Sequence, residues 1–300
     1  MAFRFSKAIF CLFVFLVLSW FAAAHAQDQQ PSAAQMAWQA AFKSATRGPS
    51  NIALGDQAVL HLPAEMAFMP KAEATALAKA LGNSTGEGFF GIIIALSENE
   101  NWMITVNHTA EGYVKDDDAK NWNADELLQS LKDGTEQQNK EREKLGIVAL
   151  DIVGWIEPPN YDAADHRLVW SMKAVDRGAA ADVPATVNYN TYALGRDGFF
   201  EFDLITNDDV IEKEKPYAKA VLDALAYNSG KRYEDFEAST DHIAEYGLAA
   251  LIGGVVAKKL GLLALAAVFL AKFAKVILVG LAVAGGGAFK FFRRKPRDNG

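Results

Sequence analysis

The sequence predicts an α+β domain, an antiparallel sheet with helices packed on it, followed by a C-terminal membrane-anchoring helix. Three observations carry this prediction. Segments in which apolar and polar residues alternate follow one another with short turns between them, as antiparallel strands do. Segments with apolar residues at helical spacing lie between those strands. Hydrophobic residues make up 51% of the 300-residue chain, a high share for a soluble protein, and the excess lies at the two ends of the chain, outside the predicted sheet.

The N-terminal residues 1–26 have the pattern of a secretory signal peptide. Arg4 and Lys7 precede a short uncharged apolar run, residues 8–23, and the run ends at the small-x-small sequence AHA, residues 24–26. Signal peptidases cleave after such a sequence. We therefore expect the mature chain to begin at Gln27, the alternative being an uncleaved N-terminal anchor.

The first half of the mature chain reads as short helices and short strands. A helix is expected near residues 36–43, and Pro70 is a favourable first residue for a second one. Apolar runs at 89–96 and 102–106, joined by a short polar turn, predict a buried hairpin. Three shorter strands are predicted before this hairpin, at residues 52–54, 58–62 and 66–69.

Three further helices are predicted along the chain. The sequence NADE at residues 123–126 fits a capping box that opens the first of them. Its nearly all-polar second half, residues 136–144, is expected to extend into solvent. Pro216 is expected to open the next helix, which ends near residues 228–230. A long helical stretch is expected from Ser239 onwards.

Four longer strands are predicted in the second half, at residues 148–156, 168–174, 187–193 and 200–204. The turn LGRDG at residues 194–198 joins the last two as a hairpin. In the last strand, Glu201 and Asp203 alternate with apolar residues, so we expect these two acids to lie on a polar, exposed face. The opposite face should be buried, and it holds Phe200, Phe202 and Leu204.

The C-terminal region predicts how the chain is anchored. Residues 247–292 are a hydrophobic membrane-associated region, with one transmembrane helix expected near residues 273–292. The basic tail, residues 293–300, would remain in the cytoplasm by the positive-inside rule, which favours a single span. A two-span hairpin turning near residues 272–275 is the alternative. The domain at residues 27–246 would then face the periplasm or cell exterior from the bacterial inner membrane.

The charge distribution argues against nucleic acid as a partner. Residues 27–257 contain 19 of the 30 Lys and Arg residues and 36 of the 37 Asp and Glu residues, a formal charge of −17. Such a domain repels phosphate backbones. It would tolerate cations or basic partners, although a solvated acidic surface is the more common meaning of such a composition.

No catalytic, cofactor-binding or metal-binding residue can be assigned from the sequence. The only cysteine, Cys11, lies in the signal segment, so the mature chain has no thiol for a disulfide or a metal. The histidines lack metal-ligand spacing, and the acidic clusters lack the spacing of a calcium loop. The histidines of the predicted mature chain are His61, His108, His166 and His242, and the clusters are residues 98–100, 116–118 and 207–209.

Four segments of the sequence have a recognisable pattern. The most specific are GKRYEDF at residues 230–236 and the stretch beginning STDH at residue 239, and the others are GDQAVLHLP at residues 55–63 and the turn GRDG at residues 195–198. In these segments the chain resembles a bacterial family of membrane-anchored proteins, the domain of unknown function 2167. This resemblance implies export and anchoring, and it implies no activity or catalytic residue. A looser likeness of residues 148–236 to photosystem-P-subunit-like folds is an analogy of fold only.

We therefore expect a membrane-anchored extracytoplasmic protein that acts as a non-catalytic binding or scaffold module of the cell envelope. Its expected partners are the lipid bilayer and an envelope protein. The alternative is an extracytoplasmic hydrolase whose site assembles from residues distant in sequence. A cleft where acids, histidines and tyrosines converge would favour the hydrolase, whereas a flat acidic or aromatic surface would favour the scaffold.

Overall fold

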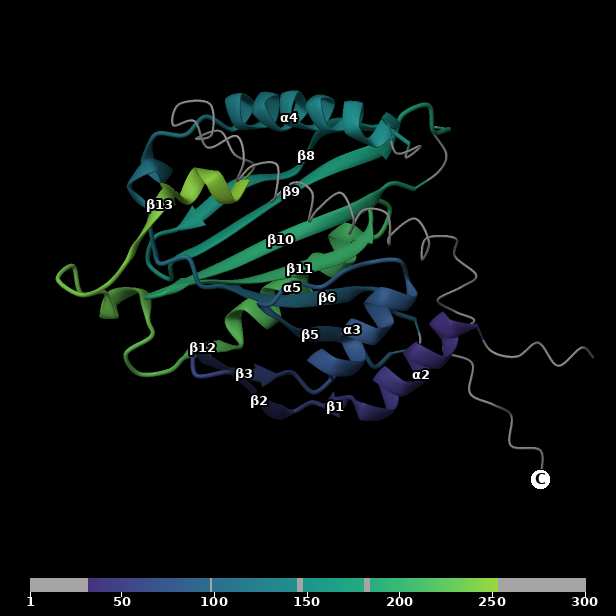
Figure 1. Ribbon diagram of the computed structural model, residues 1–300, viewed down its shortest axis with the longest axis horizontal. Helices are drawn as coiled ribbons and strands as arrows, with labels where there is room; N and C mark the ends of the chain where they lie inside the picture. The colour runs from purple at the N-terminus through teal and green to yellow at the C-terminus, as the bar shows by residue number, and fades with distance from the viewer. Residues whose placement is uncertain (1–31, 98, 145–147, 181–183, 253–300) are drawn as a thin grey trace, which may run out of the picture.

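The computed structural model describes residues 32–97, 99–144, 148–180 and 184–252 (Figure 1). The predicted signal peptide at residues 1–26 and the predicted transmembrane helix near residues 273–292 lie outside these residues. Within the described part of the chain, no helix is both long enough and apolar enough to span a membrane.

The largest element is an eight-stranded sheet in which every neighbouring pair of strands is antiparallel. From one edge to the other it contains β1 (Thr46–Arg47), β4 (Met66–Pro70), β5 (Phe89–Ala95), β6 (Met103–Thr109), β11 (Gly198–Asn207), β10 (Thr186–Gly195), β9 (Arg167–Asp176) and β8 (Leu150–Asp162). The predicted hairpins β5–β6 and β10–β11 are both present. The α+β class and the antiparallel sheet are thus confirmed.

Two small sheets accompany the main one. A three-stranded sheet has the order β12 (Leu225–Tyr227), β3 (Ala58–Leu62) and β2 (Ser50–Leu54). In the other, β13 (Ile243–Gly247) pairs in parallel with β7 (Tyr113–Lys115). The helices are α2 (Ala33–Ser44), α3 (Lys71–Ala80), α4 (Ala124–Lys144) and α5 (Ile211–Asp223), with short 3-10 turns η1 (Asp117–Lys120), η2 (Tyr233–Asp235) and η3 (Leu248–Ile252).

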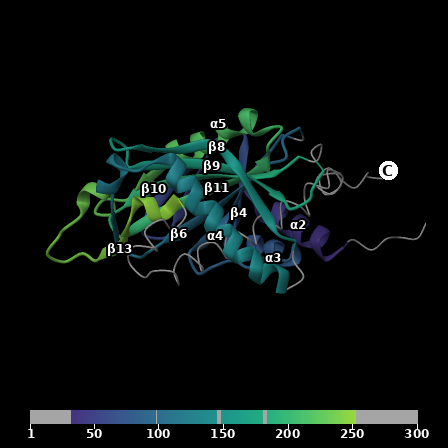
Figure 2. The same ribbon diagram turned by 90° about the horizontal axis from the view of Figure 1, so that it is seen from above.

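The main sheet has helices on both faces, as the view from above shows (Figure 2). We call them the α5 face and the α4 face. On the α5 face, α5 and the three-stranded sheet enclose one large hydrophobic core with the buried residues of β11, including Phe200, Phe202 and Leu204, each 0% exposed. The predicted orientation of these three residues is therefore correct.

The α4 face carries two separate hydrophobic clusters. Helices α2 and α3 pack on β4 and β5 at one end, where Trp38 and Leu77 are buried. Leu127 of α4 and Leu251 of η3 pack with Trp170 of β9 at the other. Between the two clusters the sheet carries polar side chains, which we call the polar stripe: Thr105, Asn107, Asn188, Asn190, Glu201 and Asp203.

The polar stripe is less exposed than the sequence predicts. Asp203, expected to be exposed with Glu201, is buried at 3% exposure, and Glu201 is half-buried. Alternation along a strand assigns a side chain to a face of the sheet, and it does so correctly here. It cannot reveal that other elements cover that face.

The prediction for helix α4 is right at its start and wrong in its second half. Its predicted start is right, because the Asn123 side chain accepts hydrogen bonds from the backbone N–H groups of Asp125 and Glu126 (2.9 and 3.4 Å). Its second half, however, is not a solvated extension, because Asn139 and Arg142 are buried against the edge strand β8. The Asn139 amide donates to the backbone oxygen of Leu150 and accepts from its N–H (both 2.8 Å), as a neighbouring strand would.

Two further helix predictions are wrong. Helix α5 begins at Ile211 and contains Pro216, because the burial of Ile211 and a hydrogen bond from Thr206 to Glu214 hold its first turn. Proline this close to the helix start removes only one intrahelical bond. The stretch from Ser239, as far as the structure describes it, is not one long helix either. It forms β13 and η3, and the described fold continues past residue 246 as far as Ile252.

Candidate functional site

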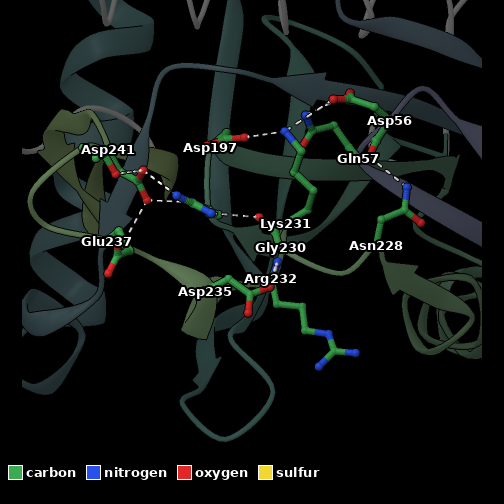
Figure 3. A network of polar contacts seen from close by, with 12 residues as sticks. Asp56, Gln57, Asp197, Asn228, Gly230, Lys231, Arg232, Asp235, Glu237 and Asp241 are labelled. Carbon is green, nitrogen blue, oxygen red and sulfur yellow. Dashed lines mark hydrogen bonds and ion pairs between the residues drawn. The ribbon is translucent and has the colours of Figure 1, made fainter.

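A network of polar contacts surrounds the turn between β10 and β11 (Figure 3). The Lys231 ammonium group contacts carboxylate oxygens of Asp197 (2.8 Å) and Asp56 (3.4 Å). The Asn228 side chain donates to the backbone oxygen of Asp56 at 2.8 Å. Three segments far apart in the sequence, near residues 56, 197 and 231, are therefore joined through one lysine.

Arg196 connects the same turn to the segment that contains Asp241. Its Nε and Nη2 donate to the two carboxylate oxygens of Asp241, each at 2.7 Å. Asp241 also accepts from the Glu237 N–H at 2.8 Å and from the Thr240 hydroxyl at 3.0 Å. These bonds, that to Arg196 first, hold the pKa of Asp241 well below its usual range. The pair is therefore ionised at all physiological pH values.

Glycine is required where these segments meet. A Cβ on Gly195 would lie 2.6 Å from the ring of Tyr227, whose hydroxyl donates to the Ala193 backbone oxygen at 2.7 Å. Gly198 adopts φ 148°, and a Cβ there would lie 1.8 Å from the Thr109 backbone oxygen. The glycines of the GRDG turn thus permit close approach of neighbouring segments.

Beside this network lies an aromatic stack. Tyr113 stacks on Phe236 and on Tyr233, with ring centroids 4.0 and 4.3 Å apart. The His166 ring lies 4.1 Å from the Tyr233 ring. The Tyr233 hydroxyl donates to the backbone oxygen of Val114 at 2.9 Å, which fixes the stack on β7. The segment at residues 230–236 therefore contributes both a polar network and an aromatic one.

An acid, a histidine and a tyrosine meet at the edge of the stack. The Tyr161 hydroxyl donates to Asp116 Oδ2 at 2.8 Å and lies 3.2 Å from His166 Nδ1. Burial, together with the neighbouring Asp116 carboxylate, raises the pKa of Tyr161 far above its usual value, so this hydroxyl remains protonated. The group offers hydrogen-bond donors and acceptors but no activated nucleophile.

A hollow of about 220 Å³ opens next to His166 and Tyr233. It is smaller than a typical small-molecule pocket of roughly 300–1,000 Å³. Charges of both signs line it, and Arg167 there is paired with Asp223. The lining residues are Asp165, His166, Arg167, Ala193, Leu194, Leu225, Ala226, Tyr227, Arg232, Tyr233 and Glu234.

The edge strand β12 forms one wall of the hollow. It is joined to β3 by backbone hydrogen bonds at Ala224 and Asn228, both 2.9 Å. Backbone groups of antiparallel strands alternate in direction, so the N–H and C=O groups of Leu225 and Tyr227 point away from β3. A partner in extended conformation could therefore find backbone donors and acceptors in this wall.

The histidines and acidic clusters considered in the sequence are dispersed. His61 and His242 are exposed, and burial lowers the pKa of His108, which packs against Phe200. The carboxylate of Asp118 caps η3 by accepting from the N–H groups of Leu248 and Ala249 (3.1 and 2.9 Å). Within the described residues, no three acids or histidines are grouped as metal ligands.

No local pattern in the sequence indicates the hollow or the aromatic stack. Tyr113, Tyr161 and Tyr233 are separated by dozens of residues, and no spacing rule connects them. The feature of the sequence that points to this region is its resemblance to the family named above. The segments at residues 55–63, 195–198 and 230–236 on which it rested all contribute to the network in Figure 3.

Comparison with known proteins identifies a family but no activity. No curated protein matches the chain. The solution structure of cyanobacterial PsbP (CyanoP) from Synechocystis sp. PCC 6803 aligns at 10% identity and a TM-score of 0.35, covering 58% of this chain and 88% of that chain. The family model "Protein of unknown function (DUF2167)" matches residues 46–282, and the chain therefore belongs to the DUF2167 family.

Proposed function

We propose that this protein is a non-catalytic binding module of the cell envelope, exported, anchored by its C-terminal hydrophobic region, and presenting the hollow beside Tyr233 to a protein partner. The observation that carries the proposal is the convergence of the network of Figure 3, the aromatic stack and the β12 edge around one small hollow. The membrane location rests on the sequence features at residues 1–26 and 273–292.

The state of the polar groups favours recognition over catalysis. Arg196 is fully engaged by Asp241, and Lys231 by two carboxylates. Tyr161 is held protonated by burial and by Asp116. Side chains that are mutually paired in this way fix the shape of a surface. A reaction centre, by contrast, needs a group whose pKa lies near the working pH.

The size of the hollow favours a side chain or short segment of a protein as the ligand. A volume of about 220 Å³ accommodates one or two side chains. The outward backbone groups of Leu225 and Tyr227 could bind an extended segment by strand addition. A peptide-like partner uses both features together, whereas a drug-sized metabolite uses neither.

Filling the hollow tests the proposal. Ala226 is exposed and lines the hollow, so Ala226→Trp should fill it without disturbing the core. Ala40→Trp, at an exposed position of α2, is the matched control. The full-length variants would be used to capture partners from detergent-solubilised membranes. We expect an envelope protein that is captured by the unaltered chain and by Ala40→Trp to fall roughly tenfold with Ala226→Trp, a loss of about 1.4 kcal/mol. Equal capture by all three chains would refute this site.

A hydrolase is the second candidate, favoured by the meeting of Asp116, Tyr161 and His166. On this reading His166 would act as the general base. Purified full-length protein would be assayed against ester, peptide and glycoside substrates. A hydrolytic activity that is abolished by His166→Asn and retained in Ala226→Trp would favour the enzyme over the binding module.

A further inference from the structure

The polar stripe on the α4 face contains a buried carboxyl group in the middle of the main sheet. Asp203 of β11 lies directly opposite Asn190 of β10 on one side and Thr105 of β6 on the other. Asp203 is 3% exposed and Asn190 is 1% exposed. Directly opposed residues of antiparallel strands have Cβ atoms about 5 Å apart, which is within reach of a side-chain hydrogen bond.

The hydrogen bonds of these two residues do not balance. The Asn190 Nδ2 donates to the backbone oxygens of Trp170 (3.3 Å) and Asn188 (3.2 Å), which fixes the orientation of its amide. Its Oδ1 then has no hydrogen-bond partner among the described residues, and neither does Asp203 Oδ1. Two directly opposed buried residues thus each carry an acceptor oxygen that has no donor among the described residues, and such unsatisfied oxygens destabilise a fold.

Within the described part of the chain, the surroundings of Asp203 supply no counter-charge to a carboxylate. Among the described residues, the charge that acts on Asp203 is that of Glu201, which has the same sign and lies two residues away on the same strand and face. Tyr192 donates its hydroxyl to Glu201 Oε1 (3.2 Å), and Asn107 donates to Thr105. No charge on α3, α4 or η3 acts on Asp203. Burial first, and Glu201 second, raise the pKa of Asp203 well above its usual value.

We propose that Asp203 is protonated in the folded domain at neutral pH and that its hydroxyl donates a hydrogen bond to Asn190 Oδ1. One proton then satisfies both orphaned oxygens and removes the repulsion from Glu201. The domain thereby carries a proton-dependent element in the centre of its sheet, on the face from which the described chain leaves at Ile252.

The consequence is a defined dependence of stability on pH. A carboxyl group whose pKa is higher in the folded than in the unfolded state stabilises the fold fully below the unfolded pKa of about 4. That stabilisation is lost as pH rises through the folded pKa. Within the window, each pH unit lowers the folding equilibrium constant up to tenfold. The contribution of Asp203 to the stability of the domain should therefore fall as pH rises from about 4 towards the folded pKa.

Infrared spectroscopy of the full-length protein in detergent tests the protonation state directly. A protonated carboxyl group gives a C=O stretching band that a carboxylate lacks. At neutral pH we expect this band in the unaltered chain, reduced in Asp203→Asn and unchanged in Asp151→Asn, whose carboxylate is paired with Arg177. A difference spectrum between the unaltered chain and Asp203→Asn that lacks this band would overturn the proposal.

A second measurement uses thermal unfolding as a function of pH. Asparagine is neutral at every pH and can donate its N–H to Asn190 Oδ1, so Asp203→Asn should fold and lose part of the decline in stability within this window. The difference in midpoint between the two chains should change by up to roughly 3–5 °C per pH unit within the window. Burial also raises the pKa of Glu214, so Glu214→Gln measures separately the part of the decline that this second carboxyl group contributes. Parallel curves for the unaltered chain and Asp203→Asn would contradict the proposal.

Discussion

The bond between Asn139 and the edge strand β8 permits a prediction with a worked magnitude. Asn139 is 1% exposed, and its amide forms two 2.8 Å hydrogen bonds with the backbone of Leu150, which is itself buried. Asn139→Ala would leave one N–H and one C=O group without partners. At about 1–3 kcal/mol for each orphaned group, the free energy of unfolding should fall by about 4 kcal/mol. For a domain of this size that lowers the midpoint by roughly 8–16 °C.

A second variant distinguishes hydrogen bonding from packing. In Asn139→Asp the carboxylate can accept from the Leu150 N–H but cannot donate to its C=O, so the variant should be destabilised at neutral pH. In acid the protonated carboxyl group can again donate, and the deficit should shrink. Thermal unfolding of the full-length chains in detergent, followed by circular dichroism, measures both effects. The matched control is Gln137→Ala on the exposed side of α4, expected within about 0.5 kcal/mol of the unaltered chain. A cost for Asn139→Ala below about 1 kcal/mol would refute the reasoning.

Three other predictions follow from the site and from the chain ends. Gly195→Val should displace the Tyr227 ring, which a Cβ would approach to 2.6 Å, and should lower the unfolding midpoint and partner capture together, whereas Ser229→Val should leave both unchanged. N-terminal sequencing of the membrane-associated protein should give Gln27, and finding Met1 or Ala2 would indicate an uncleaved anchor. A cytoplasm-only reporter fused after Gly300 should be active, and activity of a periplasm-only reporter there would require two spans.

Local patterns predicted much of the sheet. Alternation placed Phe200, Phe202 and Leu204 on one face, and the LGRDG turn fixed the β10–β11 hairpin, because a two-residue period and a tight turn leave one register that buries the apolar set. Asn123 predicted the start of α4 because its side chain satisfies backbone N–H groups within the same segment. These features depend on residues a few positions apart, so they are readable without a fold.

Prediction failed where a distant segment decides the environment. The polar sequence around Asn139 and Arg142 reads as solvated, yet both side chains form hydrogen bonds with the strand β8 and its approach. Leu225 fits the helical spacing of α5 but pairs instead with Leu60, more than 150 residues earlier in the chain. In each case a non-local hydrogen bond outweighs the local preference, which is a weak prior.

The sequence by itself determined the antiparallel α+β class, the acidic character of the domain and the absence of a thiol from the predicted mature chain, since these depend on composition and short-range periodicity. Tertiary structure alone decided the rest. It brought Asp56, Asp197 and Lys231 together, built the aromatic stack from Tyr113 and Tyr233, and buried an acid in the polar stripe. Such contacts join strands through hydrogen bonds and packing between residues far apart in the chain, and no local pattern encodes that proximity.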